Sequence, residues 1–426
     1  MPPSETILLN SLAYGGDAVG RLGEKVIFVP DGVPGDVIRV SVREDKGSFL
    51  RGVIEELVSP SPERVTPFCP LASRCGGCQW QAVSYSEQLR WKQAIVEESL
   101  RRISGIDDAE IEPCLPSPID RGYRTSVRYP AAVTGKGVVF GYYGRRSHNI
   151  IDIDNCPVAC DRINSIASNV IELFAEHYPG IHIRELSIHA SQNHPSSVIG
   201  ITTFENSDLT APAKRMLESI PGLAGIRYLP SPSHHVRNYG KSYRYERIGE
   251  KRFRISERSF FQVNAAQTEK LTGLVSEMLD IESSDIIVDG YGGVGLFSLS
   301  AAPLDTSIHL YDLSRTAVKD SLYNAREMGF TAFTAHEKDT HAAVHTIGHA
   351  DLLILDPPRQ GLGRETVEAA SVFGARAIVY VSCNPTTLAR DIKMFSETGY
   401  SIERVVPIDM FPHTFHIETV VKLRRM

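Results

Sequence analysis

The chain has 426 residues, of which 42% are hydrophobic and 23% charged, as in an average globular protein. This length exceeds one typical domain of about 150 residues, so two or three domains are expected. No apolar run approaches the ~18 residues that span a bilayer, and residues 1–5 carry no secretion signal, so we expect a cytoplasmic protein without membrane contact. The 45 Lys and Arg against 51 Asp and Glu give a formal charge of -6, which excludes a generally basic nucleic-acid binder but not a local basic surface.

Residues 7–58 form about five short apolar runs separated by turn residues such as Gly15-Gly16-Asp17. This spacing favours a small barrel of the oligonucleotide-binding type, although a purely structural β-module is nearly as common. Residues 59–67 contain three prolines and no apolar periodicity, which predicts a linker and a domain boundary.

Seven cysteines in a chain without a secretion signal argue against a disulfide framework. Cys69, Cys75 and Cys78 have the spacing C-x5-C-x2-C, which indicates a shared metal centre. Cys156 or Cys160 could supply a fourth ligand. Four thiolates suit zinc or a [4Fe–4S] cluster, and spacing does not choose between them. Buried structural cysteines are the simpler alternative.

The middle of the chain shows no catalytic motif. Residues 84–103 have helical periodicity, and residues 121–255 alternate apolar and polar residues, which predicts an α+β region of antiparallel strands with about two helices. Arginines recur beside aromatics at 121–129, 142–146 and 237–254. Taken together they favour an RNA surface, because arginine and aromatic side chains bind phosphates and stack on bases. For any single residue, a position on the solvent-exposed face of a strand is the better explanation.

The C-terminal half alternates strand and helix patterns. Largely apolar runs at 285–289, 308–312, 352–356 and 377–381 predict a parallel sheet covered on both faces. This indicates a doubly wound α/β domain with a ligand at the carboxyl ends of the strands. The glycine loop 290–295 after the first of these runs fits NAD, FAD or S-adenosylmethionine. It only approximates the dinucleotide pattern, which favours S-adenosylmethionine with Asp312 on the ribose hydroxyls.

Cys383 follows the run 377–381 in the sequence Ser382-Cys383-Asn384-Pro385. A thiolate there would be a nucleophile at the ligand edge of the sheet, and thiolate addition at C6 is what makes C5 of a pyrimidine reactive towards a methyl group. A small buried residue at a strand end is the structural alternative.

Six segments resemble known signatures. Residues 15–36 resemble a TRAM domain, and Cys69 to Gln81 resembles the cluster motif of the bacterial uracil-C5 RNA methyltransferases. Four segments of the C-terminal half resemble signatures of the same family: 259–264, 356–361, 381–391 and 409–418. The match covers nearly the whole chain in the family's order.

The resemblance implies a role for each matching residue. Cys383 is the expected nucleophile and Glu418 the base that removes the C5 proton. The expected contacts to S-adenosylmethionine are Gln262, Tyr291, Asp312 and Asp356. The expected ligands of a [4Fe–4S] cluster are Cys69, Cys75, Cys78 and, from its Cys-Pro context, Cys156.

The glycine loop departs from the family. Tyr291-Gly292-Gly293 replaces the usual Phe-Cys-Gly, and Leu296 stands where some members have asparagine, so side-chain contacts from this loop are less secure than those from Gln262 or Asp312. Asp339 matches an adenine contact in position but not in its surrounding loop.

We therefore expect a multidomain α/β protein: a TRAM-like barrel (1–58), a central α+β domain with the iron–sulfur cluster (59–255), whose helix 84–104 packs on the catalytic domain, and a Rossmann-like methyltransferase domain (256–426). The expected substrate is 23S rRNA, and tRNA is the first alternative. Cytosine-C5 methylation would need a different motif set, and a non-catalytic RNA-binding assembly factor would not need Cys383 and Glu418. The sequence indicates no obligate protein partner.

Overall fold

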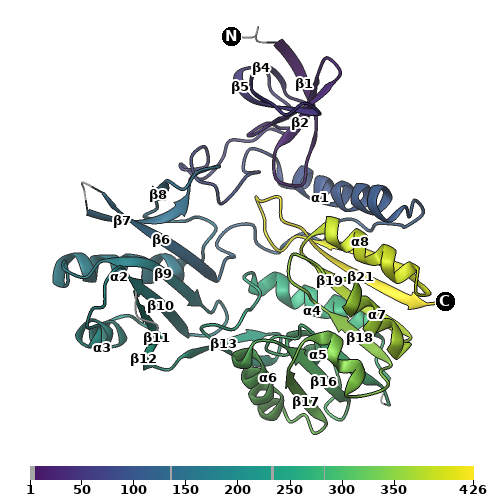
Figure 1. The fold of residues 1–426 in the computed structure, drawn as a ribbon. Coiled ribbons are helices and arrows are strands. Elements are labelled where there is room, and N and C mark those ends of the chain that lie inside the picture. Colours follow the sequence, from purple (N-terminus) through teal and green to yellow (C-terminus); the bar gives the residue numbers. More distant parts are fainter. Residues whose placement is uncertain (1–4, 135–136, 232–234, 283) are drawn as a thin grey trace.

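The computed structural model describes residues 5–134, 137–231, 235–282 and 284–426. Figure 1 shows a small β-barrel at the N-terminal end, with a central sheet and a C-terminal sheet side by side beneath it. The prediction about a secretion signal rests in part on residues 1–4, which lie outside the described residues. None of the helices in the described part of the chain is long and apolar enough to cross a membrane.

The N-terminal part is a closed barrel with the strand order β1-β2-β3-β5-β4. Alternate residues of its strands, such as Leu9, Ile27 and Ile38, are fully buried inside it, as the period of two in a strand requires. Its strands are β1 (Glu5–Leu12), β2 (Ala18–Leu22), β3 (Lys25–Val29), β4 (Val37–Asp45) and β5 (Phe49–Ser59). The predicted five-stranded barrel is confirmed.

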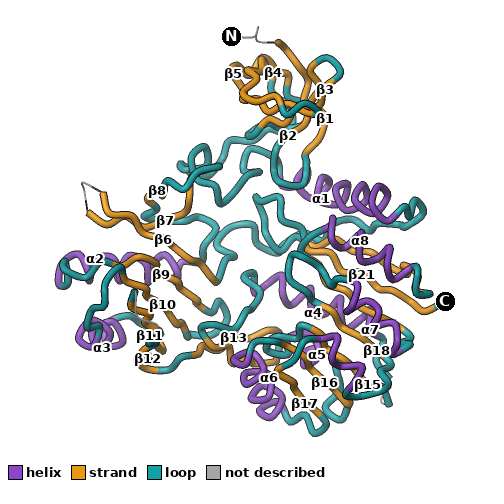
Figure 2. Tube along the Cα trace, viewed as in Figure 1, coloured by secondary structure: helices purple, strands orange, loops and turns teal. Residues whose placement is uncertain are grey.

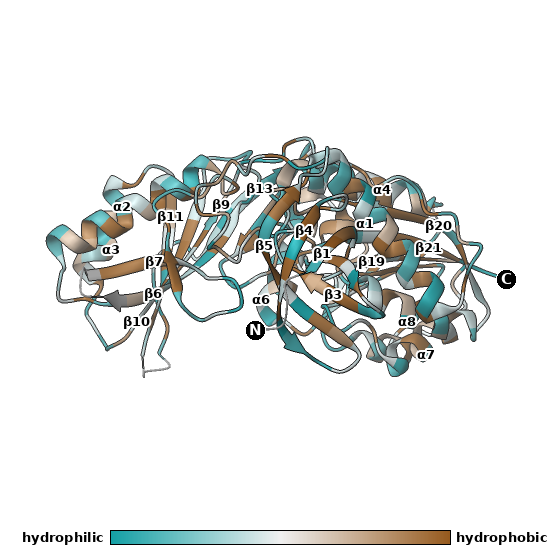
Figure 3. Ribbon diagram, turned by 90° about the horizontal axis from the view of Figure 1, so that it is seen from above, coloured by the Kyte–Doolittle hydropathy of each residue, from teal (hydrophilic) through white to brown (hydrophobic). Residues whose placement is uncertain are grey.

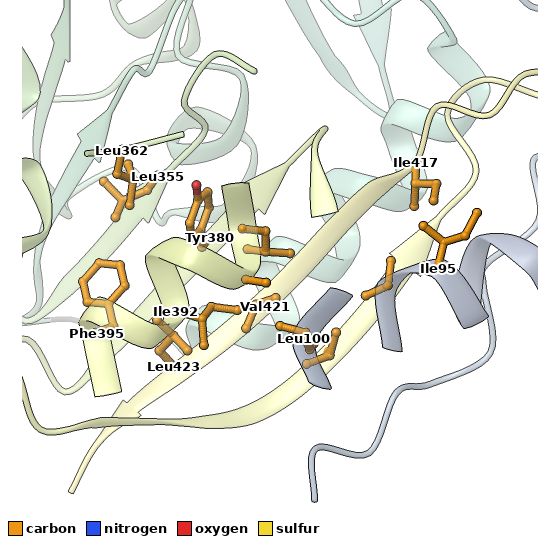
Figure 4. Packing of buried hydrophobic residues seen from close by; sticks show 14 of the residues in the cluster. Ile95, Leu100, Leu355, Leu362, Tyr380, Ile392, Phe395, Ile417, Val421 and Leu423 are labelled. Atoms are coloured by element: carbon orange, nitrogen blue, oxygen red, sulfur yellow. The ribbon is translucent and has the colours of Figure 1, made fainter. Parts of the chain in front are cut away.

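Helix α1 (Tyr85–Ser99) follows the linker and continues as a single π-helical turn, η1 (Leu100–Ser104). It begins at Ser84, whose hydroxyl accepts a hydrogen bond from the Glu87 N–H, as N-cap serines do. The helix packs against β20 and α8 of the C-terminal domain. Ile95 and Leu100 insert beside Ile417 and Val421 in one cluster of buried side chains (Figure 4).

The central domain contains one sheet of order β12-β11-β10-β9-β6-β7-β8. The predicted antiparallel pairing holds except between β10 and β11, which run parallel because α3 carries the chain back across the sheet. The strands are β6 (Ser126–Thr134), β7 (Gly137–Tyr143), β8 (Ile150–Asp152), β9 (Ile183–Ala190), β10 (Ser197–Thr203), β11 (Leu223–Pro230) and β12 (Arg237–Gly240), and the helices are α2 (Asp161–His177) and α3 (Thr210–Ser219).

A two-stranded sheet, β13 (Tyr243–Ile248) and β14 (Lys251–Ser256), leads into the C-terminal domain. The C-terminal sheet has the order β17-β16-β15-β18-β19-β21-β20. The strands are β15 (Ile286–Gly290), β16 (Ser307–Asp312), β17 (Phe333–Glu337), β18 (Leu352–Leu355), β19 (Ala377–Ser382), β20 (Tyr400–Ile408) and β21 (Glu418–Arg425). The helices are α4 (Ala265–Leu279), α5 (Leu296–Ala301), α6 (Arg315–Met328), the 3-10 helix η2 (Thr340–His345), α7 (Arg364–Phe373) and α8 (Pro385–Ser396).

This sheet is the predicted doubly wound domain. Its first five strands in spatial order are parallel, and β21 inserts antiparallel between β19 and β20. Apolar side chains of α1, α7 and α8 cover one face, and those of α4 and α5 cover the other. Figure 3 shows the hydrophobic stretches concentrated on the strands, while the helices carry hydrophilic residues on their outer sides.

A buried ion pair joins α1 to the loop before β21. Lys92 Nζ lies 2.5 Å from Asp409 Oδ1, and both side chains are fully buried. Asp409 also accepts hydrogen bonds from the Tyr85 hydroxyl at 3.0 Å and from the Phe411 N–H at 3.1 Å. Lys92 donates a second hydrogen bond to the Phe411 carbonyl at 3.1 Å. These additional bonds offset the cost of removing two charges from water.

Replacing Lys92 with methionine should destabilise the protein by about 3–5 kcal/mol, because Asp409 would remain buried without its counter-charge. Urea unfolding followed by tryptophan fluorescence measures this, since Trp80 and Trp91, the only tryptophans, flank this contact. Lys214→Met is the control: its ion pair with Glu218 is exposed, and we expect a loss below ~1 kcal/mol. Equal losses in both variants would contradict the structural role of the buried pair.

Candidate functional site

The loops of the three parts meet at the centre of the molecule, as the tube in Figure 2 shows. Strands β15, β16, β18 and β19 are parallel, so their carboxyl ends lie at one edge of the C-terminal sheet. Tyr291, Asp312, Asp356 and Cys383 lie at these ends. Glu418 begins the antiparallel β21 beside the end of β19, and Gln262 lies in the segment before α4. This edge is therefore where the structure brings them together.

Cys383 follows the last residue of β19 and is partly exposed. The next residue, Asn384, caps α8 by accepting the Thr386 N–H, and its amide donates to the Arg359 carbonyl at 3.0 Å. The turn that carries the thiol is thus tied to the loop after β18. Burial, together with the nearby carboxylates of Glu418 and Asp356, raises the pKa of the Cys383 thiol to about 12, while Arg359 acts in the opposite direction.

Two carboxyl groups face this thiol. Glu418 begins β21, which pairs antiparallel with β19 so that Ser382 lies opposite Thr419. Asp356 follows β18, the neighbour of β19 on the other side. Burial and the charge of Asp356 raise the pKa of Glu418 well above its usual value. Burial and the charges of Asp289 and Asp312 raise that of Asp356 to about 8.

Arg359 is the positive group of this site. Its guanidinium lies 3.4 Å from both ring nitrogens of His416. Burial, followed by the charge of Arg359, lowers the pKa of His416 to about 3. His416 is therefore neutral and does not compete with Arg359 for the carboxylates. Cys383, Glu418, Asp356 and Arg359 together offer a thiol, two proton acceptors and one fixed cation.

A second group of predicted residues lines a pocket beside the glycine loop. Gln262, Tyr291 and Asp356 share this pocket with Phe261 and Phe297. The pocket holds about 30 Å³ and encloses a small group only, so the rest of a nucleoside ligand would lie along the open edge beside Asp312. Asp339 caps η2 by accepting the His341 N–H, next to the Thr340 hydroxyl that accepts the Tyr291 N–H.

Asp312 lies at the end of β16 and holds the glycine loop. Its carboxylate accepts the Gly293 N–H at 3.0 Å and the Ser314 N–H at 2.7 Å. A pyrophosphate would need the N–H groups of this loop and would be repelled by the carboxylate already bound there. The geometry therefore disfavours a dinucleotide, as the loop sequence predicted.

The charges around the pocket fit a cationic ligand. Asp289 is fully buried, and this burial raises its pKa to about 7. The charge of Asp312 also raises the pKa, whereas the hydrogen bond from the Ser298 hydroxyl lowers it. The Oδ1 atom of Asp289 has no hydrogen-bond partner among the residues that the structure describes. Three acids in one site repel one another, and a positively charged sulfonium or ammonium group would relieve that repulsion. S-adenosylmethionine carries both groups.

The four predicted metal ligands line one cavity of about 60 Å³, together with Arg124 and other residues. These ligands are Cys69, Cys75, Cys78 and Cys156. Within the residues that the structure describes, no three His, Cys, Asp or Glu side chains lie close enough to hold a single metal ion. Cys160 does not line this cavity; it precedes α2, with its N–H donating to the Arg124 carbonyl.

The arginine and aromatic residues of the central domain divide between its interior and its surface. Tyr123 and Tyr129 are buried in the central core. Arg145 and Arg146 form ion pairs with Asp31 and Asp17 of the barrel. These two arginines therefore help to join the central domain to the barrel. Arg121, Arg128 and Arg237 are exposed, so the RNA surface stays a prediction.

Sequence reasoning missed one contact at the nucleophile. The Tyr14 hydroxyl, from the barrel, donates to the Cys383 carbonyl at 3.3 Å, and its ring packs edge-on against Phe415 at 5.5 Å. Tyr14 stands directly before the Gly15-Gly16-Asp17 turn, a motif already recognised. Nothing in the local sequence indicates a partner 369 positions away.

Family models match both ends of the chain. One described as "tRNA (Uracil-5-)-methyltransferase" matches residues 345–426, and the TRAM domain model matches residues 5–54. An RNA methyltransferase of Thermosynechococcus vestitus is 33% identical, over 97% of this chain and 96% of its own length. One of Synechocystis is 31% identical, over 98% of this chain and 95% of its own.

A solved structure agrees over the whole fold. This chain is 28% identical to the Pyrococcus abyssi tRNA (uracil-54, C5)-methyltransferase, whose crystal structure contains S-adenosyl-L-homocysteine. The match has a TM-score of 0.78 and covers 98% of this chain and 100% of that one. Barrel, central domain and doubly wound domain therefore occur in the same arrangement in both. With its glycine-loop pocket and its relatives over almost the full length, the chain belongs to the RNA (uracil-C5-)-methyltransferase family.

Proposed function

We propose that the protein transfers the methyl group of S-adenosylmethionine to C5 of a uridine in RNA through a covalent adduct between Cys383 and C6. The observation that carries the proposal is the placement of Cys383 and Glu418 on the paired ends of β19 and β21, beside the pocket that contains Asp356. The proposed nucleophile and the proposed base thus lie at adjacent ends of two paired strands, where one base of the RNA could contact both.

Each residue has one task in this scheme. Cys383 adds to C6 and converts C5 into an enolate carbon, which is nucleophilic enough to take a methyl group. S-adenosylmethionine supplies that methyl group as the electrophile on its sulfonium. Glu418 then removes the C5 proton as the bond between Cys383 and C6 breaks. Burial and the charge of Asp356 raise the pKa of Glu418, which makes its carboxylate a stronger base than an exposed one.

The substrate RNA is proposed as 23S rRNA, with tRNA as the second candidate. The sequence favoured rRNA because the barrel and the cysteine motif resemble the rRNA enzymes. The Pyrococcus structure favours tRNA: its match covers 98% of this chain, so it includes the barrel, which therefore occurs in a tRNA enzyme as well. Nucleoside mass spectrometry of both RNA classes, from cells lacking the gene and complemented with wild type or Cys383→Ala, separates the two.

A groove beside the barrel supports RNA binding. It holds about 710 Å³ between the barrel strands and α1, and its lining includes Phe28, Phe49, Arg21 and Arg102. The rings of Phe28 and Phe49 pack edge-on at 5.4 Å, and Arg51 lies 5.7 Å from the Phe49 ring. Aromatic rings with arginines along a groove suit bases and phosphates of single-stranded RNA. Glu98 lines the same groove and pairs with Arg102 at 3.2 Å, so the groove is only weakly basic.

We also propose that the cysteine cavity holds a [4Fe–4S] cluster on Cys69, Cys75, Cys78 and Cys156. A single zinc ion would draw its thiolates to about 2.3 Å from one point, whereas a cubane binds each thiolate at a different iron and keeps the sulfurs farther apart. What supports a cluster at this place is that the four cysteines line one cavity. Arg124, in the same cavity, would offset the negative charge of a thiolate-bound cluster.

The protein purified without oxygen should be brown and contain about four irons per chain, because a cubane carries four. Cys156→Ser should abolish the colour and the iron. Cys160→Ser, a substitution of a neighbouring thiol outside the cavity, should retain both. Metal analysis and visible absorption measure this, and stoichiometric zinc without iron would contradict the assignment.

Asp312→Ala should weaken S-adenosylmethionine binding by roughly 1.5–3 kcal/mol, the usual loss for hydrogen bonds to a charged group. Titration calorimetry measures the affinity. Asp305→Ala is the matched control, because Asp305 is exposed just before the start of the same strand, at the end away from the pocket. An unchanged affinity in Asp312→Ala would mean that another residue holds the ribose.

Substitution of Cys383 and of Glu418 should stop the reaction at different stages. Cys383→Ala should bind RNA and S-adenosylmethionine but form no adduct. Glu418→Gln should add and methylate but not eliminate, so it should accumulate a protein–RNA complex that survives denaturing electrophoresis. Wild-type protein with 5-fluorouracil RNA should be trapped in the same way, because fluorine cannot leave as a proton.

Methylation by Cys383→Ala would overturn the covalent mechanism. Normal turnover by Glu418→Gln would assign the base to another residue, and His413 and His416 are the candidates nearest in the sequence.

A further inference from the structure

The barrel reaches the nucleophile through one loop, residues 13–17 between β1 and β2. The loop is a tight turn closed by hydrogen bonds from the Ala13 N–H to the Asp17 carbonyl and from the Gly16 N–H to the Ala13 carbonyl. Gly15 and Gly16 have φ angles of +118° and +100°, which favour glycine. The turn therefore projects Tyr14 from the barrel in one defined direction.

Three contacts hold this loop against the catalytic centre. The Tyr14 ring packs edge-on against Phe415, the Trp80 indole N–H donates to the Gly16 carbonyl at 3.1 Å, and the Tyr14 hydroxyl donates to the Cys383 carbonyl at 3.3 Å. A Cβ atom on Gly16 would lie 2.9 Å from the Gln79 side chain and 3.2 Å from the Phe415 ring, so this side of the loop is closely packed. The hydroxyl is thus presented by a loop packed against the residues beside the catalytic centre.

The Cys383 carbonyl has a particular place in the turn. It follows β19, whose ladder with β21 ends at Ser382, and it precedes Asn384, the cap of α8. Holding this carbonyl fixes the peptide plane between Cys383 and Asn384, and so restrains the backbone of the turn from which the Cys383 side chain extends. Burial, with the charges of Cys383 and Glu418 adding to it, raises the pKa of Tyr14 to about 12, so its hydroxyl remains a donor at neutral pH.

We infer that Tyr14 is a positioning residue for Cys383, so that the barrel completes the active site in addition to contacting RNA. The inference rests on the proposed role of Cys383 as nucleophile. Tyr14 and Thr386 also line the groove that contains Phe28 and Phe49. The same side chain therefore borders the surface proposed for RNA and holds the turn of the thiol, which connects seating of the RNA to alignment of the sulfur.

Tyr14→Phe tests this with the least change, because it removes the hydroxyl and keeps the ring that packs on Phe415. In single-turnover reactions with saturating 5-fluorouracil RNA and S-adenosylmethionine, adduct formation should slow about tenfold, as expected for the loss of one aligned hydrogen bond. The dissociation constants for RNA and S-adenosylmethionine should change less than about twofold, since neither ligand bonds to this hydroxyl in the proposal.

Tyr400→Phe is the matched control. Its hydroxyl also donates to a backbone carbonyl, that of Ala375, at 2.9 Å. Tyr400 begins β20 opposite Arg425, at the end of the sheet away from Cys383. It should form the adduct at the wild-type rate.

The outcomes separate this inference from the proposed function. Adduct formation at the wild-type rate by Tyr14→Phe would overturn the positioning role. So would weaker RNA binding with an unchanged rate at saturating RNA, because Tyr14 would then be an RNA contact only. Absence of an adduct in the wild-type protein would instead refute the covalent mechanism itself.

Discussion

The buried pair of Lys92 and Asp409 holds the segment on which the catalytic centre depends. Residues 409–418 leave the C-terminal sheet after β20 and return as β21, and they carry His413, Phe415 and His416 on the way to Glu418. No helix or strand orders this segment. Lys92 holds its first residues, because it binds both the Asp409 carboxylate and the Phe411 carbonyl. Helix α1, which precedes the central sheet in the chain, is therefore structurally a part of the C-terminal domain.

The stretch after the cysteine motif joins all three parts of the molecule. The Trp80 N–H donates to the His413 carbonyl at 3.0 Å, and its indole N–H donates to the barrel at Gly16. Gln88 of α1 donates to the Trp80 carbonyl at 3.1 Å and accepts the His413 N–H at 2.8 Å. The proposed cluster would thus stabilise the loop from which barrel, α1 and catalytic segment are held together. It lies outside the pocket of the methyl-transfer residues, which agrees with a structural role.

The electrostatics of the site explain why its parts need one another. Asp289, Asp356 and Glu418 all have raised pKa values because they are buried close together. This arrangement favours a cationic methyl donor but disfavours a thiolate, and the same carboxylates raise the pKa of Cys383. Arg359 is the positive charge that counteracts them. Binding of a sulfonium beside Asp356 would add a second, and so would favour ionisation of the thiol at the stage when it must react.

Much of the fold and site could be predicted from local sequence. The order of strands and the residues directly after them, such as Asp312, Asp356 and Cys383, follow from apolar runs, and parallel strands bring their ends to one edge whatever the rest of the chain does. The five-stranded barrel and the helix over residues 84–104 are local in the same sense. The spacing of Cys69, Cys75 and Cys78 was enough to predict that they lie together, and they line one cavity.

Other features were decided by tertiary structure alone. The sequence left Cys156 and Cys160 open, and only the path of the chain into α2 brings the first to the cavity and leaves the second outside it. In the sequence Lys92 stands close to other charged residues of α1, and nothing there marks it as buried. Its burial depends on Asp409, which lies 317 positions away. Tyr14 meets Cys383 for the same kind of reason. Periodicity and motif spacing reflect contacts within an element, whereas these side chains are placed by the packing of elements that the chain brings together only when it folds.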